Sequence, residues 1–307
     1  MTYKKPEIIK FDDTITITSS VVIFGNFDGV HLGHQSLIDE LIKYGHKKTK
    51  VLITFHPHTQ SIVKNSNSLK LITPYREKLK LLSTFNIDYI SIINFNSSFS
   101  KLSPDQFIDS IINKYNPQTI IIGYDNNFGF KGKGNYIFLK KYLIDKNIEL
   151  YQNKPFSLNN SIIKSSLIKE LIKNGDIKSA NSYLGRKFKL SGNITNGNKI
   201  GKKIGFPTAN LKIEDKQQII PKVGVYSVNL IVGTKKYKAL CNIGYRPTFF
   251  ERGKLSIESY IVNHNDLDLY NTYISLEFNF FIREEIKFNN KEGLVKQIKK
   301  DIEALNC

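Results

Sequence analysis

The sequence predicts two domains: an α/β domain around a parallel, doubly wound sheet, followed by a small antiparallel β-barrel that ends in a helix. The chain has 307 residues, enough for two domains at roughly 150 residues each. In its first part, short apolar runs alternate with helical patterns, an order typical of parallel sheets. After residue 185 the chain changes to short alternating segments separated by Gly, Pro and Asn, which favours a barrel. We therefore expect domains over residues 1–183 and 184–307.

The strands and helices of the first domain are predicted from apolar runs and their spacing. Residues 20–24 form a β-branched apolar run that leads into a glycine loop, after which apolar side chains recur at helical spacing from Leu37 to Ile42. Further buried runs predict strands at residues 51–55, 89–93 and 119–122. Helical patterns predict helices over residues 74–85, 104–115, 166–173 and 177–184.

The second domain shows the alternation of half-buried strands. Such segments cover residues 224–232, 236–243, 255–261 and 273–282. Gly233-Thr234 and Arg252-Gly253 are hairpin-type turns between some of them. Near the end of the chain, an apolar stripe at a spacing of three to four predicts an amphipathic helix packed on the barrel; its members are Leu294, Ile298, Ile302 and Leu305.

Composition excludes several classes of protein. Apolar residues make up 40% and charged residues 23% of the chain, which is typical of a globular protein and not of a disordered or collagen-like one. No apolar run approaches the ~20 residues that span a bilayer, and no apolar stretch follows Lys4 and Lys5 as in a secretory signal. Two cysteines, Cys241 and Cys307, are too few for a disulfide framework. We expect a cytoplasmic protein with no membrane partner.

The net charge of +18 raises the question of a nucleic-acid partner. However, the basic residues are mostly Lys, are dispersed from end to end, and accompany many Ile and Asn residues, as A/T-rich coding would produce. A reader of bases needs clustered Arg with interleaved aromatic side chains. Specific nucleic-acid binding is therefore not expected, although a basic nucleic-acid-binding protein on an inherited fold stays open as a distant alternative.

A glycine loop with two histidines forms the first candidate site. Residues 25–34 read Gly-Asn-Phe-Asp-Gly-Val-His-Leu-Gly-His and follow the first buried strand, at the edge where open α/β sheets bind ligands. Glycines let the backbone approach a phosphate, and the next helix offers free N–H groups. His31 and His34 are three residues apart, so both rings can face one phosphate; a zinc pair or two surface histidines is the alternative. The other candidate phosphate ligands are Gly25, Asn26, Phe27, Asp28 and Gly33.

A second glycine-spaced, basic loop precedes Thr208 and Asn210. Backbone amides of such turns bind anions, and the hydroxyl and amide oxygens suit Mg²⁺, which takes few protein ligands. We expect Thr208 and Asn210 to hold the metal. The candidate ATP-binding residues are Gly201, Gly205 and Pro207, and a merely structural hairpin loop is the alternative.

These motifs resemble the bacterial bifunctional riboflavin kinase/FAD synthetase family. Residues 25–34 resemble the family's H-x-G-H nucleotidyltransferase motif in its flavin-adenylylating form. Residues 54–58 resemble the family's Thr-Phe-x-Pro-His segment, and residues 123–129 resemble its Gly-x-Asp-Phe-x-Phe-Gly loop. Residues 205–211 resemble the ATP loop of riboflavin kinases, and the family pattern continues at residues 221–226, 242–249 and 268–270. The resemblance implies a Rossmann-like nucleotidyltransferase domain and a six-stranded riboflavin kinase barrel.

The resemblance also implies two reactions: phosphorylation of riboflavin to FMN by ATP, then adenylylation of FMN to FAD with release of pyrophosphate. Mg²⁺ is implied at both sites and ATP is the co-substrate. By resemblance, His31 and His34 hold ATP phosphates and Asp125 lies near the nucleotide or the flavin phosphate. The segment with Ser165, Ser166 and Lys169 corresponds to the family's Ser-Ser-Thr-x-Ile-Arg.

Two residues depart from the family pattern. Lys169 stands where the family has Arg, and Asn126 where it has Phe. A lysine gives a point charge without the bidentate fork of arginine, so a protein with only the kinase activity is an alternative, as is adenylylation of another phosphorylated cofactor precursor.

By resemblance, Glu258 is the catalytic base of the kinase. Two residues later, where the family often has His, this chain has Tyr260. Deprotonating a primary alcohol needs such a carboxylate. Arg283 is expected to face the flavin or phosphate, with a surface ion pair to Glu285 as the alternative. The sequence sets no expectation for the oligomeric state.

Overall fold

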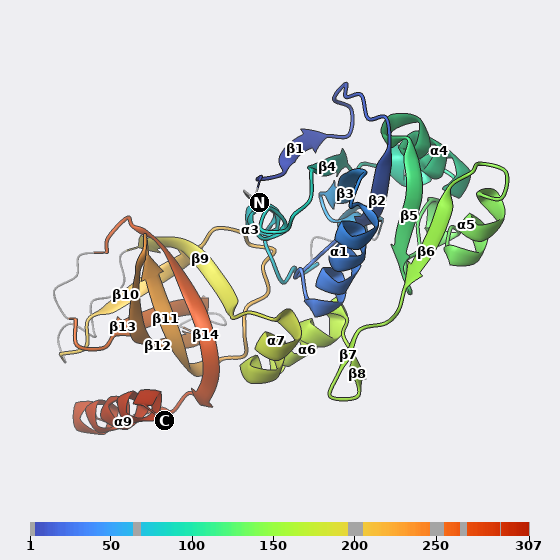
Figure 1. Ribbon diagram of the computed structural model, residues 1–307. Coiled ribbons are helices and arrows are strands. Elements are labelled where there is room, and N and C mark those ends of the chain that lie inside the picture. The colour runs from blue at the N-terminus through green and yellow to red at the C-terminus, as the bar shows by residue number, and fades with distance from the viewer. Residues whose placement is uncertain are drawn as a thin grey trace. The chain divides into compact units, whose positions relative to one another are not determined.

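The computed structural model describes residues 4–63, 69–195, 205–245, 255–264, 269–288 and 290–306. The chain forms two compact units, Met1–Ser165 and Ser166–Cys307 (Figure 1). None of the helices in the described ranges is long and apolar enough to cross a membrane.

The first unit contains a six-stranded sheet in the order β1-β4-β3-β2-β5-β6, with every neighbouring pair parallel. The predicted parallel sheet is therefore confirmed. Its four central strands match the four predicted runs, whereas the edge strands β1 and β6 were not predicted. The strands are β1 Glu7–Lys10, β2 Ser20–Gly25, β3 Thr49–His56, β4 Tyr89–Asn94, β5 Pro117–Gly123 and β6 Glu149–Asn153.

The sheet is covered on both faces, which explains its continuous apolar strands. Along β2, Val22 and Phe24 belong to one buried cluster, and Val21 and Ile23 belong to another. The helices of the unit are α1 Leu32–Tyr44, α2 Thr59–Val63, α3 Tyr75–Leu82, α4 Pro104–Tyr115 and α5 Tyr136–Tyr142; the short elements are the 3₁₀ turns η1 Phe99–Lys101 and η2 Phe130–Gly132 and the hairpin strands β7 Ser157–Leu158 and β8 Ser161–Ile162.

Local sequence sets the ends of these helices. Helix α4 begins at a capping box in which Ser103 and Gln106 satisfy each other's backbone N–H groups, with Pro104 at the first helical position. It ends at Asn116, whose φ of 43° lies in the left-handed region. The side chain of Asn116 also donates to the carbonyl oxygen of Thr18 at 2.6 Å, so the same residue ends the helix and ties it to the segment before β2.

The second unit is a closed antiparallel barrel in the order β10-β13-β12-β11-β14-β9, which confirms the expected six-stranded barrel. Gly233 and Thr234 form a two-residue turn between β11 and β12; the predicted turn at Arg252-Gly253 lies outside the described residues. The strands are β9 Phe188–Thr195, β10 Thr208–Ile213, β11 Gly224–Val232, β12 Lys235–Tyr245, β13 Leu255–Ile261 and β14 Tyr273–Arg283.

In the described part of the second unit, the helices beside the barrel are α6 Ser165–Asn174, α7 Ile177–Leu184 and α9 Lys291–Glu303, the last followed by η3 Ala304–Asn306. The compact units divide between Ser165 and Ser166, whereas the sequence-based boundary stands at 183/184, so the difference consists of α6 and α7. Asn181 on α7 explains part of it, because its side chain donates to the carbonyl oxygen of Phe278 at 2.9 Å and accepts from the backbone N–H of Phe188.

Candidate active sites

The glycine loop of the first unit leaves β2 and bends sharply before α1. Phe27, Gly29 and Val30 all have positive φ, of 51°, 89° and 40°. A Cβ on Gly29 would lie 3.0 Å from Cδ1 of Ile72, so both conformation and space favour glycine there. The ring of Phe27 is buried and packs edge-on against the ring of His34. The loop is therefore a closely fitted turn.

His31 and His34 come together at the start of α1, as predicted. Their rings are stacked with centroids 3.6 Å apart, and His31 is buried. His31 is also the N-cap of the helix, since its Nδ1 accepts from the backbone N–H of His34 at 3.3 Å. A Cβ on Gly33 would lie 3.3 Å from the His31 ring, so the glycine between the histidines leaves room for their stacking.

Asp28 holds the loop in place. Its Oδ1 accepts from the backbone N–H groups of Ile72 and Thr73 at 2.9 and 3.2 Å, and the side chain is buried. Its carbonyl oxygen accepts from the Ser165 hydroxyl at 2.9 Å. Asp28 and Ser165 are thus brought together, through the backbone of Asp28; a phosphate contact of either residue stays a prediction. Ser166 is exposed and Lys169 half-buried on the first turns of α6.

The loop after β5 carries Asp125 and Asn126. Asp125 is exposed. The side-chain amide of Asn126 donates to the carbonyl oxygen of Phe24 at 3.0 Å, so Asn126 fastens this loop to the end of β2. Because β5 pairs with β2 in parallel, both loops leave the same edge of the sheet.

One residue at this edge was missed by the sequence analysis. Lys78 on α3 is buried, and its ammonium donates to oxygens at the ends of β2 and β3. A signal was present, because Lys78 lies three residues after Tyr75 and four before Leu82, on the helix face that also buries Leu82.

The predicted base and metal ligands of the kinase lie on two paired strands of the barrel, where Asn210 is buried and Glu258 is half-buried. Asn210 of β10 lies opposite Glu258 of β13, and Thr208 lies opposite Tyr260. The Thr208 hydroxyl donates to Oε2 of Glu258 at 3.4 Å. The alternate residues of β13, such as Ile257 and Ser259, are buried. Glu258 is therefore turned outward, beside both proposed metal ligands.

The loop before β10 is described only from residue 205 onward, so Gly201 lies outside the described residues. Gly205 has a φ of 85°, and a Cβ there would meet nothing within 4 Å, so backbone conformation rather than crowding favours glycine. Between Gly205 and Thr208, the ring of Phe206 packs edge-on against Tyr260 at 5.1 Å between centroids; Pro207 follows it directly.

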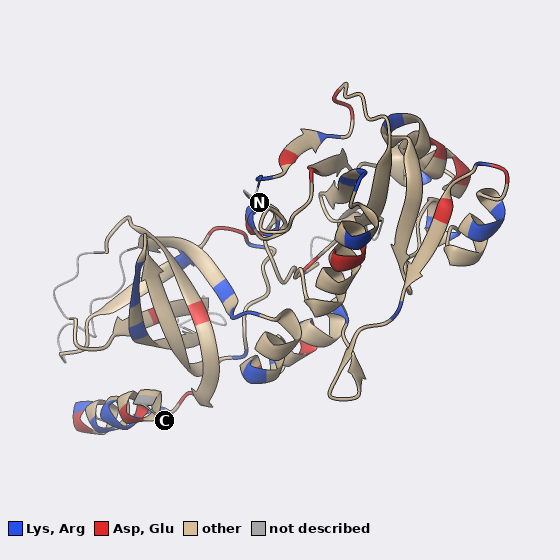
Figure 2. Ribbon diagram, in the orientation of Figure 1, with Lys and Arg blue, Asp and Glu red and all other residues tan. Residues whose placement is uncertain are grey.

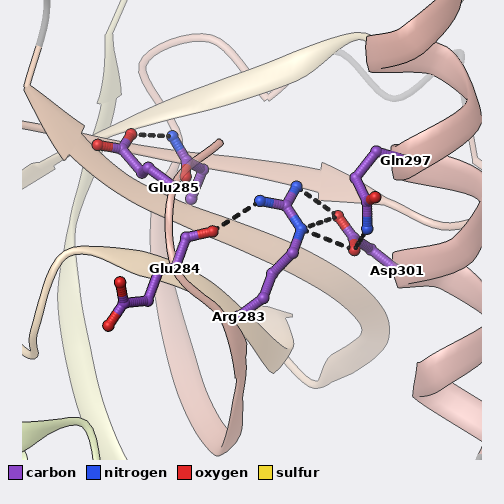
Figure 3. A network of polar contacts seen from close by, with 6 residues as sticks. Arg283, Glu284, Glu285, Gln297 and Asp301 are labelled. Carbon is purple, nitrogen blue, oxygen red and sulfur yellow. Dashed lines mark hydrogen bonds and ion pairs between the residues drawn. The ribbon is translucent and has the colours of Figure 1, made fainter. Parts of the chain in front are cut away.

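Arg283 does not pair with Glu285, so that alternative is wrong. Its Nε and Nη2 donate to the carboxylate of Asp301 on α9 at 2.9 and 2.7 Å, and its Nη1 donates to the carbonyl oxygen of Glu284 at 2.8 Å (Figure 3). The reason is that α9 brings the buried Asp301 to the end of β14. Glu285 instead accepts from the side-chain amide of Asn242 at 3.3 Å. Contact of Arg283 with a flavin or phosphate stays a prediction.

Charge is distributed over both units. Lys and Arg lie on many elements of each, and on α9 they are mixed with Asp and Glu (Figure 2). The described basic residues are thus dispersed, as on ordinary solvated surfaces, and do not form a continuous stripe that would bind nucleic acid.

Two family models match the chain. The FAD synthetase model covers residues 14–167, and the riboflavin kinase model covers residues 184–306. A curated relative from Buchnera aphidicola subsp. Schizaphis graminum, named bifunctional riboflavin kinase/FMN adenylyltransferase, is 40% identical over 94% of this chain and 93% of that protein. A relative of the same name from Bacillus subtilis is 36% identical over 92% and 90%. This chain belongs to the bifunctional riboflavin kinase/FMN adenylyltransferase family.

A solved structure shares the fold over the whole chain. It is described as a macrolide-efflux protein from Streptococcus pneumoniae, is 29% identical, and matches with a TM-score of 0.89 over 97% of this chain and 98% of that one. This likeness supports the fold alone. The two family models show that this chain contains both predicted domains, the nucleotidyltransferase and the kinase.

The donor set on the barrel fits Mg²⁺. Thr208 and Asn210 present a hydroxyl and an amide on the same face as the Glu258 carboxylate, and oxygen ligands of this kind are what Mg²⁺ prefers. No group of three or more His, Cys, Asp or Glu side chains that would hold a metal occurs among the described residues. The arrangement suits an ion that arrives with the phosphates of ATP and takes few protein ligands.

Proposed function

We propose that this chain phosphorylates riboflavin to FMN in its barrel and converts FMN to FAD in its first unit, consuming ATP in each step. The observation that supports the proposal best is that one family member contains two separate arrangements of side chains that suit phosphate chemistry. Stacked histidines lie at a helix start beside a glycine loop, and an outward carboxylate lies beside a hydroxyl and an amide on the barrel.

In the kinase reaction, Glu258 accepts the proton of the riboflavin 5′-hydroxyl. The hydroxyl oxygen then bonds to the γ-phosphorus of ATP, the bond to the β,γ-bridging oxygen breaks, and ADP leaves. Thr208 and Asn210 hold Mg²⁺, which when bound neutralises charge on the transferring phosphoryl group. The hydrogen bond from Thr208 to Glu258 orients the carboxylate, and Arg283 is proposed to contribute to the flavin side of this site.

In the adenylylation reaction, a phosphate oxygen of FMN bonds to the α-phosphorus of ATP and pyrophosphate leaves. The nucleophile is already ionised, so no base is required. His31 and His34 stabilise the charge that develops on the phosphoryl oxygens. The positive end of the α1 dipole adds to the same field. Asp125, Ser166 and Lys169 are proposed to contact the nucleotide or flavin phosphate.

Chromatography of products formed from riboflavin, Mg²⁺ and α-labelled ATP tests both steps at once. FMN should form first and labelled FAD should follow. Accumulation of FMN without FAD, at saturating FMN and ATP, would establish the alternative of a kinase alone, which Asn126 and Lys169 keep open. Absence of both products, with salt-sensitive binding of RNA, would instead favour the nucleic-acid alternative. The cytoplasm is the proposed compartment, in keeping with a buried free thiol at Cys241.

A further inference from the structure

Lys78 is a buried lysine at the edge of the sheet that carries the stacked histidines. Its residue surface is 6% exposed. The ammonium donates to Oγ1 of Thr54 at 2.9 Å, to the carbonyl oxygen of Asn26 at 3.1 Å and to that of Phe55 at 3.2 Å. An ammonium has three hydrogens, and here each has an acceptor.

These three oxygens lie at the end of β3 and at the start of the glycine loop that runs from β2 to the two histidines. Thr54 and Phe55 lie at the end of β3, and Asn26 directly follows β2, its parallel neighbour. The Thr54 hydroxyl also donates to the carbonyl oxygen of Asn26 at 3.3 Å. Lys78 therefore completes a hydrogen-bond network that joins the two strand ends where the glycine loop begins.

Asn26 extends this network toward α2. Its side-chain amide donates to Oγ1 of Thr59 at 2.9 Å, and its Oδ1 accepts from the backbone N–H of Thr59 at 3.2 Å. Asn26 is held on both sides, by Lys78 through its carbonyl oxygen and by Thr59 through its side chain. An apolar side chain at position 78 would leave buried acceptors without their donor, which is costly.

We propose that protonated Lys78 is a positioning residue for adenylyl transfer, because it fixes the start of the loop that carries His31. This inference rests on the proposed adenylylation and adds a residue to it. A neutral amine has two hydrogens and a lone pair, and cannot donate to three oxygens at once. Loss of the proton therefore releases one strand end and loosens the loop.

The surroundings bring this proton loss into an accessible pH range. Burial lowers the pKa of Lys78 to about 8, and the Asp28 carboxylate opposes that shift. Tyr75 is another titratable group near it, with its ring centre 6.0 Å from the ammonium, and His56 at the end of β3 stacks on Tyr75. Burial raises the pKa of Tyr75, so this phenol does not lose its proton near pH 8.

The test compares three variants in the full chain: Lys78→Met, Lys78→Arg and, as a matched control, Lys80→Met. Lys80 lies two residues further along the same helix and is exposed. FAD formation from FMN and ATP is followed between pH 6.5 and 9.5, and FMN formation from riboflavin in the same preparation reports on the rest of the chain. The ¹³Cε resonance of Lys78 is titrated in parallel.

We expect FAD formation by the unmodified chain to fall above about pH 8, approaching tenfold per pH unit. Lys78→Met should lower kcat for FAD at pH 7 by about 100-fold, the scale of a 1 Å misplacement, and should lose the alkaline decline, whereas FMN formation is unchanged. Lys78→Arg should keep activity to higher pH because a guanidinium stays charged. Lys80→Met should behave as the unmodified chain.

A Lys78→Met variant with the unmodified rate and pH profile would overturn the proposal, as would an alkaline decline near pH 8 that persists in Lys78→Arg. If Lys78→Met does not fold, Lys78→Arg and the ¹³Cε titration decide: a resonance that shows no change between pH 7 and 9.5 contradicts the proposal. A chain that forms FMN but no FAD at any pH refutes the proposed adenylylation instead, and the titration still reports on Lys78.

Discussion

Arg283 and Asp301 form a bidentate ion pair that joins the last strand of the barrel to the last helix. Asp301 is 3% exposed, and both of its oxygens accept from the guanidinium at 2.7–3.1 Å. Gln297, one helical turn before it, donates to the same carboxylate at 2.9 Å. A carboxylate buried on α9 thus has a full set of donors, which is the condition under which a buried charge is tolerated.

Asp301→Asn is expected to destabilise the barrel by about 2–3 kcal/mol, because the amide loses a charge-assisted pair and places a donor against the guanidinium. Urea unfolding of the full chain, followed by a probe in the barrel, measures this change. Glu303→Gln is the matched control, since Glu303 lies two residues further along the helix and is exposed. Equal midpoints for the two variants would mean that the pair contributes nothing to stability.

His31 has two roles that two variants can separate. The ring is proposed to face the phosphates, and its Nδ1 caps α1. His31→Ala removes both roles, whereas His31→Asn keeps a good N-cap. Both variants should lower FAD formation by about 100–1000-fold, but only His31→Ala should lose about 1 kcal/mol of helix stability.

The measurements for His31 are FAD formation, FMN formation and thermal unfolding of each variant. FMN formation should stay at the unmodified level in both, because the barrel carries that reaction. Full FAD formation by His31→Asn would contradict a phosphate role and leave His31 as a helix cap alone.

The sequence predicted the centre of the sheet better than its edges. Strands β2 to β5 are packed on both faces and therefore read as continuous apolar runs. The edge strand β1 has the pattern Glu-Ile-Ile-Lys with one buried residue, and β6 contains Tyr, Gln and Asn, so neither produces such a run. The sequence therefore predicts those strands that are buried on both faces of the sheet.

The candidate sites divide in a similar way. Residues within one motif, such as His31 and His34, were predictable because a single turn of helix brings them together. Lys78 meets Asn26 and Arg283 meets Asp301 only through the topology, which spacing along the chain does not encode. Asp301 and Lys78 nevertheless share a signal: each is a charged residue on the face that its helix turns inward, and such a residue indicates a buried partner.

Glu258→Gln should lower FMN formation from riboflavin by about 100- to 10,000-fold, because the amide cannot accept the hydroxyl proton. FAD formation from supplied FMN should be unchanged. Glu277→Gln is the control, since Glu277 is another barrel glutamate, on β14, whose carboxylate pairs with Lys236 at 2.8 Å. Loss of both reactions in Glu258→Gln would contradict separate sites, and retention of FMN formation would remove Glu258 from the role of base.

Lys169→Arg tests the proposed contact of Lys169 with ATP in adenylylation. A guanidinium can bind a phosphate through two parallel N–H groups, whereas an ammonium acts as a point charge. If Lys169 contacts the triphosphate, the variant should lower KM for ATP in FAD formation by about fivefold to tenfold, the effect of about 1 kcal/mol, and leave kinase kinetics unchanged. Lys173→Arg, one turn further along α6, should change neither constant. An unchanged KM in Lys169→Arg would mean that Lys169 is an ordinary solvated helix lysine. Binding of ATP would then depend on the glycine loop and its histidines.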